Sequence, residues 1–309
     1  MIAVVAVGLI LLVLPGAFRQ SLSRIRPVLW SRLAAGFLAV GAGLVTVGLL
    51  AMALPTLFTG IGAHHLAALC QRLIHDTLAL GHPGGIAATA ALVVVGARGG
   101  MGLFMVRRAR RSASVESWVG DHRRGSDHDL VILPTARPVA MSSNARRRQI
   151  ILSTGLITAL RDEELEMVIR HELSHMGHHH HRYLELGSVV EKALGWLPLV
   201  RASVQSLRLG LERWADEEAA GPDPASRRTL RSALLATTGL HARPGFVGFG
   251  SADMVALRAR ALEQGPGAQT LRWWYPIVAL TTVVTASTAG LSSLAVLSVS
   301  LASTGLCYL

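Results

Sequence analysis

Four long runs of apolar residues stand out in the pattern of hydrophobic and polar positions along the chain. The runs cover about residues 2–18, 33–58, 86–106 and 276–301. A transmembrane helix needs about 20 consecutive apolar residues, and the first run is marginal by this measure. Aromatic residues at 273–275 precede the last run and are typical of a membrane interface. The pattern predicts an integral membrane protein, mostly α-helical, with four transmembrane helices.

Arginine residues are distributed unevenly around these runs. The basic flanks are the loop after the first run, with Arg19, Arg24, Arg26 and Arg32, and the segment after the third run, with Arg107, Arg108, Arg110 and Arg111. The loop between the second and third runs contains only Arg72. Because basic loops stay in the cytoplasm, we expect a multi-pass protein of the inner or plasma membrane with both termini outside. The first run lacks the basic start and cleavage site of a signal peptide, so we expect a retained anchor.

The composition agrees with a membrane protein. Hydrophobic residues make up 51% of the 309 residues and charged residues only 16%, which excludes disordered, collagen-like and disulfide-scaffold proteins. The membrane-flanking arginines account for much of the net charge of +11, and no nucleic-acid-binding motif accompanies it. We therefore expect no nucleic-acid partner. The bias toward arginine, alanine and glycine suggests a GC-rich bacterial genome.

The segment between the third and fourth runs has the length of one ordinary domain. Short apolar runs bounded by turn residues predict strands over 130–133, 138–141 and 149–152, and Pro138 suits an edge strand. The rest of the segment is predicted to be helical, with a break at 221–224. We expect three parts: a membrane domain with three transmembrane helices (1–106), a cytoplasmic α+β domain with a small β-sheet (107–272), and a fourth transmembrane helix with a short outer tail (273–309).

One predicted helix of this domain has a polar residue on its apolar face. The helix begins near Asp162, and the exception is Glu172, within the sequence His171-Glu172-Leu173-Ser174-His175. Histidines four residues apart share a helix face, so both imidazoles of this H-E-x-x-H pattern can reach one metal ion. Glu172 lies about 100° round the helix, where it can hold and deprotonate a water molecule. The alternative is a polar helix in a histidine-rich stretch.

A later pair of acidic residues strengthens the metal interpretation. Glu212 and Asp216 lie one turn apart on another predicted helix. A catalytic zinc usually has three protein ligands and one open position, so Glu212 can be the third ligand. Asp216 can accept the free ring N–H of a ligand histidine and fix its tautomer. Alone, the pair would indicate a solvated helix face, and Glu217 and Glu218 are rival ligands that lie further round the helix.

Four histidines at 178–181 follow the H-E-x-x-H pattern directly. A second metal site is conceivable, but consecutive helical residues point in different directions and cannot all bind one ion. We therefore expect these histidines to extend the motif helix as far as Arg182. Tyr183, His241 and Arg243 are candidates for stabilising an oxyanion, and the sequence does not select among them.

The H-E-x-x-H helix followed by Glu-x-x-Ala-Asp at 212–216 resembles the gluzincin-type membrane metallopeptidases. Two families share this combination: the heat-shock and CAAX-protease family, and metallopeptidase family 56, the BlaR/MecR antirepressor family. The stretch 150–156 and the sequence Glu-Glu-Leu at 163–165 are also similar to both. Three spans before the protease domain and one after it resemble family 56 more closely.

The resemblance implies a zincin-like fold and a zinc endopeptidase with one zinc ion per chain at the inner face of the membrane. It implies that the metal ligands are His171, His175 and Glu212, that Glu172 is the general base, and that Asp216 supports a ligand histidine. It also implies that an edge strand near Val139 and Met141 pairs with the substrate backbone. The sequence departs from the family there, because the segment 141–144 lacks the expected Pro-Gly turn.

These inferences predict an enzyme that hydrolyses peptide bonds of cytoplasmic or membrane-proximal proteins. A transcriptional repressor and misfolded membrane protein are the two kinds of substrate that the resemblance suggests. An intramembrane protease is rejected because the motif helix is too polar for lipid. A non-catalytic membrane sensor that retains the zinc-binding fold is the alternative, although a purely structural site would not need Glu172. The sequence leaves the oligomeric state open.

The two cysteines, Cys70 and Cys307, both fall outside the membrane in this topology. That side is oxidising in a host with such a compartment, so we predict that the two residues lie within reach of a disulfide bond.

Overall fold

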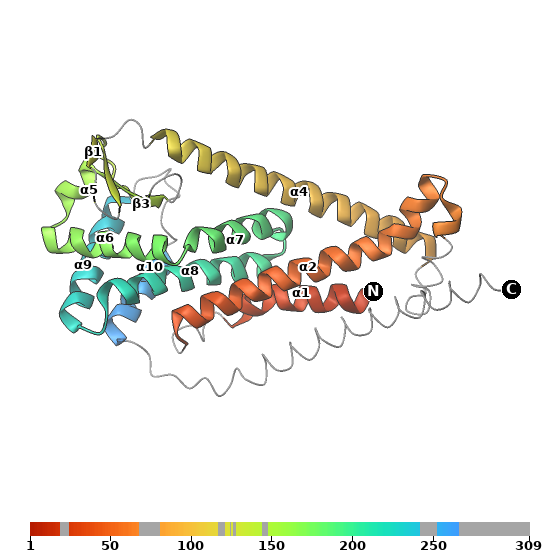
Figure 1. Cartoon of the computed structure of the whole chain (residues 1–309). Coiled ribbons are helices and arrows are strands. Elements are labelled where there is room, and N and C mark those ends of the chain that lie inside the picture. The colour runs from red at the N-terminus through yellow and green to blue at the C-terminus, as the bar shows by residue number, and fades with distance from the viewer. Residues whose placement is uncertain are drawn as a thin grey trace, which may run out of the picture. The chain divides into compact units, whose positions relative to one another are not determined.

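The computed structural model describes residues 1–18, 25–67, 81–116, 121–123, 125, 128–143, 148–241 and 252–265 (Figure 1). The helices are α1 (Ile2–Ala17), α2 (Pro27–Gly60), α4 (Gly81–Glu116), α5 (Thr154–Ala159), α6 (Asp162–Gly177), α7 (His180–Leu194), α8 (Pro198–Ala220), α9 (Pro224–His241) and α10 (Ala252–Gln264). The strands are β1 (Asp121–Arg123), β2 (Asp129–Leu133), β3 (Ala140–Ser143) and β4 (Gln149–Ser153). The prediction of a mostly helical chain with a small β-sheet is confirmed.

Two of the described helices are long and apolar enough to cross a membrane. The qualifying segments are Pro27–Gly60 and Pro83–Ala109, and they extend the predicted runs 33–58 and 86–106 at both ends. Helix α1, the first predicted span, has 16 residues and is shorter than the roughly 20 that a span requires. The fourth predicted span, 276–301, lies outside the described residues. The structure therefore suggests membrane association, but it does not support four transmembrane helices.

The chain divides into two compact units, which we describe separately. The first unit includes residues 1–12 and 39–97, and the second includes residues 13–38 and 98–269. Within the first unit, α1 and α2 approach each other through glycines. A Cβ atom added to Gly8 would lie 2.8 Å from the carbonyl oxygen of Gly41. Small residues at such positions permit close contact between the backbones of apolar helices.

A four-stranded mixed sheet lies in the second unit, in the order β1-β2-β4-β3. Strands β2 and β4 are parallel, and β3 pairs antiparallel with β4 so that Met141 lies opposite Ile151. The strands predicted over 130–133 and 149–152 are confirmed to within one residue. The strand predicted over 138–141 begins at Ala140, so Pro138 precedes the edge strand rather than forming part of it. Strand β1 was not predicted, because its three residues are all exposed and polar.

Helix α6 packs its apolar face on the sheet and on α9. This face carries Leu165, Val168, Ile169, Leu173 and Met176, and it covers the buried side chains of Ile150, Leu152, Leu156, Leu160 and Ala233. The 3.6-residue period of the helix directs His171 and His175 toward α8, whereas Glu172 stays on the side of the sheet, next to β3. Figure 1 shows α6 and α7 one after the other within the second unit, with α8 alongside both.

Helix α8 is anchored to the start of α2 within the same unit. The indole N–H of Trp30, which is 1% exposed, donates to the backbone oxygen of Ser206 at 3.3 Å. A Cβ atom on Gly210 would lie 2.8 Å from the side chains of Trp30 and Ser31, so glycine permits this close approach. Helix α8 then ends at Ala220 and α9 begins at Pro224, as the predicted break at 221–224 requires.

Candidate metal centre

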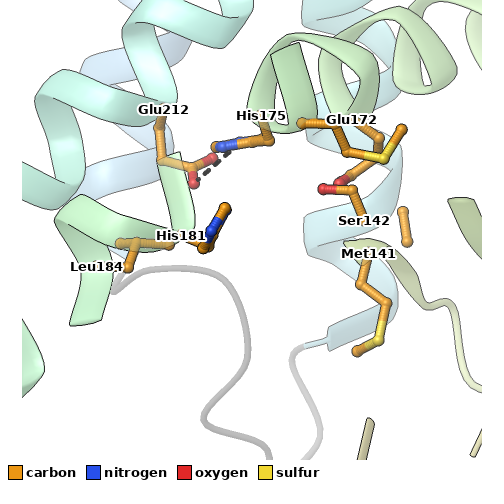
Figure 2. Close-up of a pocket in the computed structure, with 9 residues that line it drawn as sticks. Met141, Ser142, Glu172, His175, His181, Leu184 and Glu212 are labelled. Carbon is orange, nitrogen blue, oxygen red and sulfur yellow. Dashed lines mark ion pairs between the residues drawn. The ribbon is translucent and has the colours of Figure 1, made fainter. Parts of the chain in front are cut away.

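Helices α6 and α8 bring three potential metal ligands together. The Nε2 atoms of His171 and His175 lie 3.1 Å apart. The two carboxylate oxygens of Glu212 lie 3.5 Å from His171 Nε2 and 3.6 Å from His175 Nε2. Figure 2 shows Glu212 facing His175 across the gap between the two helices. One ligand atom from each of the three residues lies within 4.8 Å of the others, so the group could hold a metal ion.

The donor set and its spacing fit a zinc ion. In a tetrahedral site with ligands at about 2.0–2.1 Å, neighbouring donor atoms lie about 3.3–3.4 Å apart. The Nε2–Nε2 separation of 3.1 Å is close to that value, as is the distance from each Nε2 atom to its nearer Glu212 oxygen, 3.5 Å to Oε2 and 3.6 Å to Oε1. Two imidazole nitrogens that face each other at 3.1 Å repel through their lone pairs unless a proton or a cation lies between them. The arrangement is therefore favourable for a cation.

The carboxylate of Asp216 lies behind His171, on the side away from the other two ligand residues. Its Oδ1 atom is 3.0 Å from His171 Nδ1, and both side chains are buried. A carboxylate at this distance favours a proton on Nδ1 and leaves the Nε2 lone pair of His171 directed at the site. Helical spacing explains the placement, because Glu212 and Asp216 occupy successive turns on one face of α8.

Arg258 on α10 holds both acidic residues, and the sequence analysis missed it. Its guanidinium donates to both Asp216 oxygens, at 2.8 and 2.7 Å, and lies 2.8 Å from Glu212 Oε2. The residue is 7% exposed. Arg258 is one of many arginines in this chain and belongs to no motif that the sequence analysis used. Its burial beside two carboxylates is visible only in the tertiary structure.

Burial and ion pairing act in opposite directions on these groups. Burial lowers the pKa of His171, but the Asp216 and Glu212 carboxylates outweigh it and raise the pKa to about 10. Burial raises the pKa of Asp216, but Arg258 outweighs it and holds the pKa at about 2. Burial also opposes ionisation of Glu212, yet Arg258 and the two histidines keep its pKa well below its usual range. Both carboxylates are therefore ionised at neutral pH and favour a bound cation.

Glu172 lies beside the three potential ligands, at a cleft of about 200 Å³. Its side chain is 4% exposed and lines this cleft together with His175 and Glu212. Figure 2 shows Glu172 on the side of the cleft where Ser142 lies, with Glu212 opposite. The cleft is large enough for a side chain and several waters, and a carboxylate at its wall can accept a proton from a bound water.

The edge strand β3 forms one wall of the same cleft. Ala140, Met141 and Ser142 line it from the strand, and His181 and Leu184 line it from α7. Because β3 is the last strand in the sheet order, no strand of the described residues pairs with its outer edge, and such an edge can pair with an extended chain. The segment 141–144, where the family's Pro-Gly turn is missing, is described only as far as Ser143.

The rival acidic residues point to other partners. Glu217 lies 3.6 Å from Arg213 on its own helix. Glu218 accepts a hydrogen bond from Ser174 at 2.6 Å and lies 2.7 Å from His178. Neither of them belongs to the group of three potential ligands.

The described residues do not select among the candidates for stabilising an oxyanion. Tyr183 packs edge-on against His180, with ring centroids 6.4 Å apart. His241 ends α9, and its side chain is outside the described residues, as are Arg243 and both cysteines.

The predicted continuous helix through the four histidines is wrong. Helix α6 ends at Gly177, His179 has a φ of +54°, and α7 starts at His180. A non-glycine residue in the left-handed region is uncommon, and here it interrupts the helix between α6 and α7. As a result His180 is fully buried, with its Nδ1 atom 2.8 Å from His175 Nδ1. Burial lowers the pKa of His180 to about 3, so its ring is neutral.

A comparison with known families finds a peptidase signature in this part of the chain. Residues 136–211 match the sequence model of Peptidase family M48. The match covers β3, β4, α5, α6, α7 and most of α8, and it ends one residue before Glu212. It covers less than half of the chain and supports a metallopeptidase function of the M48 type. The specific resemblances to family 56 and to the heat-shock and CAAX-protease family are not confirmed. No curated protein and no solved structure matches the chain.

Proposed function

We propose that this chain is a membrane-associated zinc metalloendopeptidase of the gluzincin type. The observation that carries the proposal is the grouping of His171, His175 and Glu212 within 4.8 Å at a cleft that Glu172 also lines. The match to Peptidase family M48 over the helix that carries three of these four residues supports it. The donor set, with two imidazoles and one carboxylate, is that of a catalytic zinc site with an open position.

In this proposal His171, His175 and Glu212 hold one zinc ion per chain. Bound there, the ion would polarise the scissile carbonyl and lower the pKa of water toward neutrality. Asp216 keeps the proton of His171 on Nδ1, and Arg258 holds Asp216 and Glu212 in place with three short contacts. The protein thus supplies a preformed site whose ligands need little reorganisation.

Glu172 acts as the general base and then as the general acid. Its carboxylate accepts a proton from the attacking water and delivers that proton to the nitrogen of the leaving amine. The wall position of Glu172 in the cleft supports this role, because a substrate carbonyl between Glu172 and the histidines would lie within reach of both. General acid–base catalysis of this kind contributes about 10²–10⁴ in rate.

The substrate is an extended polypeptide that adds to the outer edge of β3. Backbone hydrogen bonds to the residues around Val139 and Met141 would fix its direction, and the cleft would accept a side chain next to the scissile bond. Met141 and Leu184 give this part of the cleft an apolar surface. This mode selects unfolded or flexible segments, because a folded strand has its own partners.

The finer aspects of location and substrate follow from the charge pattern and the family resemblance. We propose that the zinc domain (107–272) faces the cytoplasm, between the membrane domain (1–106) and a fourth span (273–309). A repressor or a misfolded membrane protein close to the bilayer is then within reach. The alternative function, a non-catalytic sensor, has the same ligands but no use for Glu172.

Hydrolysis of an unfolded protein such as casein by the full chain, purified in detergent, tests the proposal. We expect cleavage that a zinc chelator stops and that added zinc restores. Zinc bound at one ion per chain without any cleavage would favour the sensor. Cleavage that continues in the chelator would contradict the metallopeptidase.

A further inference from the structure

His180 is a buried histidine that the proposed mechanism does not use. Its side chain is fully buried, and its ring packs against the indole of Trp214 with centroids 4.6 Å apart. The ring of His178 stacks against it with centroids 5.9 Å apart and also contacts Trp214, at 4.6 Å. Its closest polar contact is with the candidate ligand His175, whose Nδ1 lies 2.8 Å from His180 Nδ1. A polar ring held so tightly beside a metal ligand calls for an explanation.

The tautomer of His175 determines the direction of the hydrogen bond between the two rings. His175 presents its Nε2 atom to His171 and Glu212, so a metal at that position would take the Nε2 lone pair. The ring proton of His175 then resides on Nδ1. Two facing nitrogens can share only one proton, so His175 Nδ1–H donates and His180 Nδ1 accepts. His180 must then carry its own proton on Nε2.

The interruption of the helix is what puts His180 in this position. In a continuous helix, five residues correspond to about 500°, which would place residue 180 about 140° round the axis from His175. The chain instead leaves the helix at Gly177, and with His179 in the left-handed conformation His180 Nδ1 lies 2.8 Å from His175 Nδ1. A strained conformation next to a candidate functional site is consistent with a specific demand on His180.

Packing alone does not account for a histidine at this position. The Nε2 atom of His180 is buried and has no hydrogen-bond partner among the described residues. A buried N–H without a partner is unfavourable, so an apolar ring would fill the space beside Trp214 and His178 at lower cost. The hydrogen bond to His175 is the interaction that an apolar ring could not replace.

We propose that His180 is a positioning residue for the metal centre: its Nδ1 atom accepts the hydrogen bond from His175 Nδ1–H and keeps His175 Nε2 directed at the ion. The inference rests on the proposed zinc site and extends it. The two ligand histidines then have different outer partners. His171 is held by the anionic Asp216 and His175 by a neutral imidazole. Such partners orient a ligand ring and are worth about 10- to 100-fold in metal affinity.

Zinc affinity in the detergent-purified full chain, measured by competition with a chromophoric chelator, tests this inference. His180→Phe keeps an aromatic ring against Trp214 and His178 but removes the acceptor. His180→Gln offers an amide oxygen to His175 and fits the apolar surroundings less well. His179→Asn is the matched control, because it changes an exposed neighbour and asparagine tolerates the left-handed conformation. The absorption spectrum of the cobalt-substituted proteins reports the ligand geometry independently of activity.

We expect His180→Phe to weaken zinc binding 10- to 100-fold and to alter the cobalt spectrum, with His180→Gln closer to wild type and His179→Asn unchanged. A role in packing alone predicts the reverse order, with Phe at least as good as Gln, and that order would overturn the inference. Equal zinc affinity in all four proteins would overturn it as well. A His175→Ala chain with the same zinc content as the wild-type chain would contradict the proposed zinc site itself. That result is distinct from a failure of the inference about His180.

Discussion

The buried charges around the candidate metal centre depend on one another. Two ionised carboxylates, Glu212 and Asp216, share the guanidinium of Arg258, and all three groups are buried or nearly so. Without a cation in the site, Arg258 supplies the positive charge that offsets the desolvation of both acids. Removing one partner of such a buried set leaves an uncompensated charge, which is far more costly than losing a surface ion pair.

Substitution of Arg258 by Met should therefore destabilise the fold. We expect Arg258→Met to lower the free energy of unfolding of the metal-free chain by about 3–5 kcal/mol, as seen when one partner of a buried pair is removed. Chemical denaturation in detergent measures this difference. Arg260→Met is the matched control, because Arg260 lies on the exposed side of the same helix, and it should change stability by less than about 0.5 kcal/mol. Similar effects of the two substitutions would contradict this account.

At the residue scale, the spacing of residues along the sequence predicted which site residues share a helix face. The pairs His171/His175 and Glu212/Asp216 each lie one turn apart, so the sequence could place each pair on one face of a helix. The approach of the two helices, which brings Glu212 to the histidines, was inferred from the three protein ligands that a catalytic zinc needs and from the family resemblance. Arg258 and His180 could not be found in this way. One depends on where α10 packs, and the other on a backbone conformation that no glycine or proline at residue 179 marks.

Helix α6 begins with an ion pair that bridges its first turn. Glu164 Oε2 accepts from the backbone N–H of Arg161 at 3.1 Å, and Glu164 Oε1 accepts from its guanidinium at 3.0 Å. The hydrogen bond from the Arg161 side chain is the main reason that the pKa of the buried Glu164 falls to about 2. Burial alone would raise this pKa. The carboxylate also lies at the positive end of the helix dipole. This contact fixes the start of the helix that carries the H-E-x-x-H pattern.

The pKa shift of Glu164 predicts a dependence of stability on pH. Its pKa is lower in the folded than in the unfolded chain, so its contribution is fully present above about pH 4.5 and is lost as the pH falls toward 2. We expect Glu164→Gln to reduce the free energy of unfolding by about 1–2 kcal/mol at pH 7. The difference from wild type should narrow below about pH 4.5.

Denaturation of both proteins at several pH values measures this effect. Glu163→Gln is the control, because the neighbouring Glu163 is exposed and should show a much smaller difference. A Glu164→Gln difference that stays constant from pH 7 to pH 3 would refute the assignment.

At the scale of elements, the strands with apolar runs were predictable and the polar strand was not. Strands β2 and β4 are apolar because both lie inside the sheet. Strand β1 consists of Asp121, His122 and Arg123, and only its pairing with β2 makes it a strand. The end of α6 at Gly177 was missed because the polar residues that follow it were expected to continue the same helix.

At the scale of the whole molecule, the apolar surface of α4 is the clearest sign of a membrane. Only 6% of an apolar 18-residue stretch within Pro83–Ala109 is buried. Large apolar side chains such as Val93, Val94 and Phe104 are 64%, 52% and 58% exposed. A soluble protein rarely leaves so long an apolar surface in water. The long apolar helix α2 also suggests membrane association, although 33% of its apolar 18-residue stretch is buried inside the chain.

The chain should therefore behave as an integral membrane protein. We expect it to remain in the membrane pellet after extraction with alkaline carbonate and with high salt, and to be released by detergent. A peripheral protein with the same basic charge would be released by salt, because its attachment would be electrostatic. Recovery of the full chain in the carbonate or salt supernatant would contradict membrane insertion.

The apolar helices differ in how well the sequence predicted them as spans. The apolar runs predicted the positions of α2 and α4 well, because hydrophobic length is the dominant signal for such helices. Helix α1 was predicted as a span because it is apolar throughout, although its run is marginal in length. Charge bias predicts an orientation, but orientation is a property of the chain in a bilayer and needs its own measurement.

The central claim is that Glu172 is the base of a zinc peptidase, and the most direct test compares wild type with Glu172→Gln. Both full-length proteins would be purified in detergent, checked for zinc content, and incubated with an unfolded protein whose fragments are identified by mass spectrometry. We expect equal zinc content, specific cleavage by wild type, and a rate at least 100-fold lower in Glu172→Gln, because the amide cannot accept the proton of water. Cleavage of the same bonds at the wild-type rate by Glu172→Gln would contradict the account.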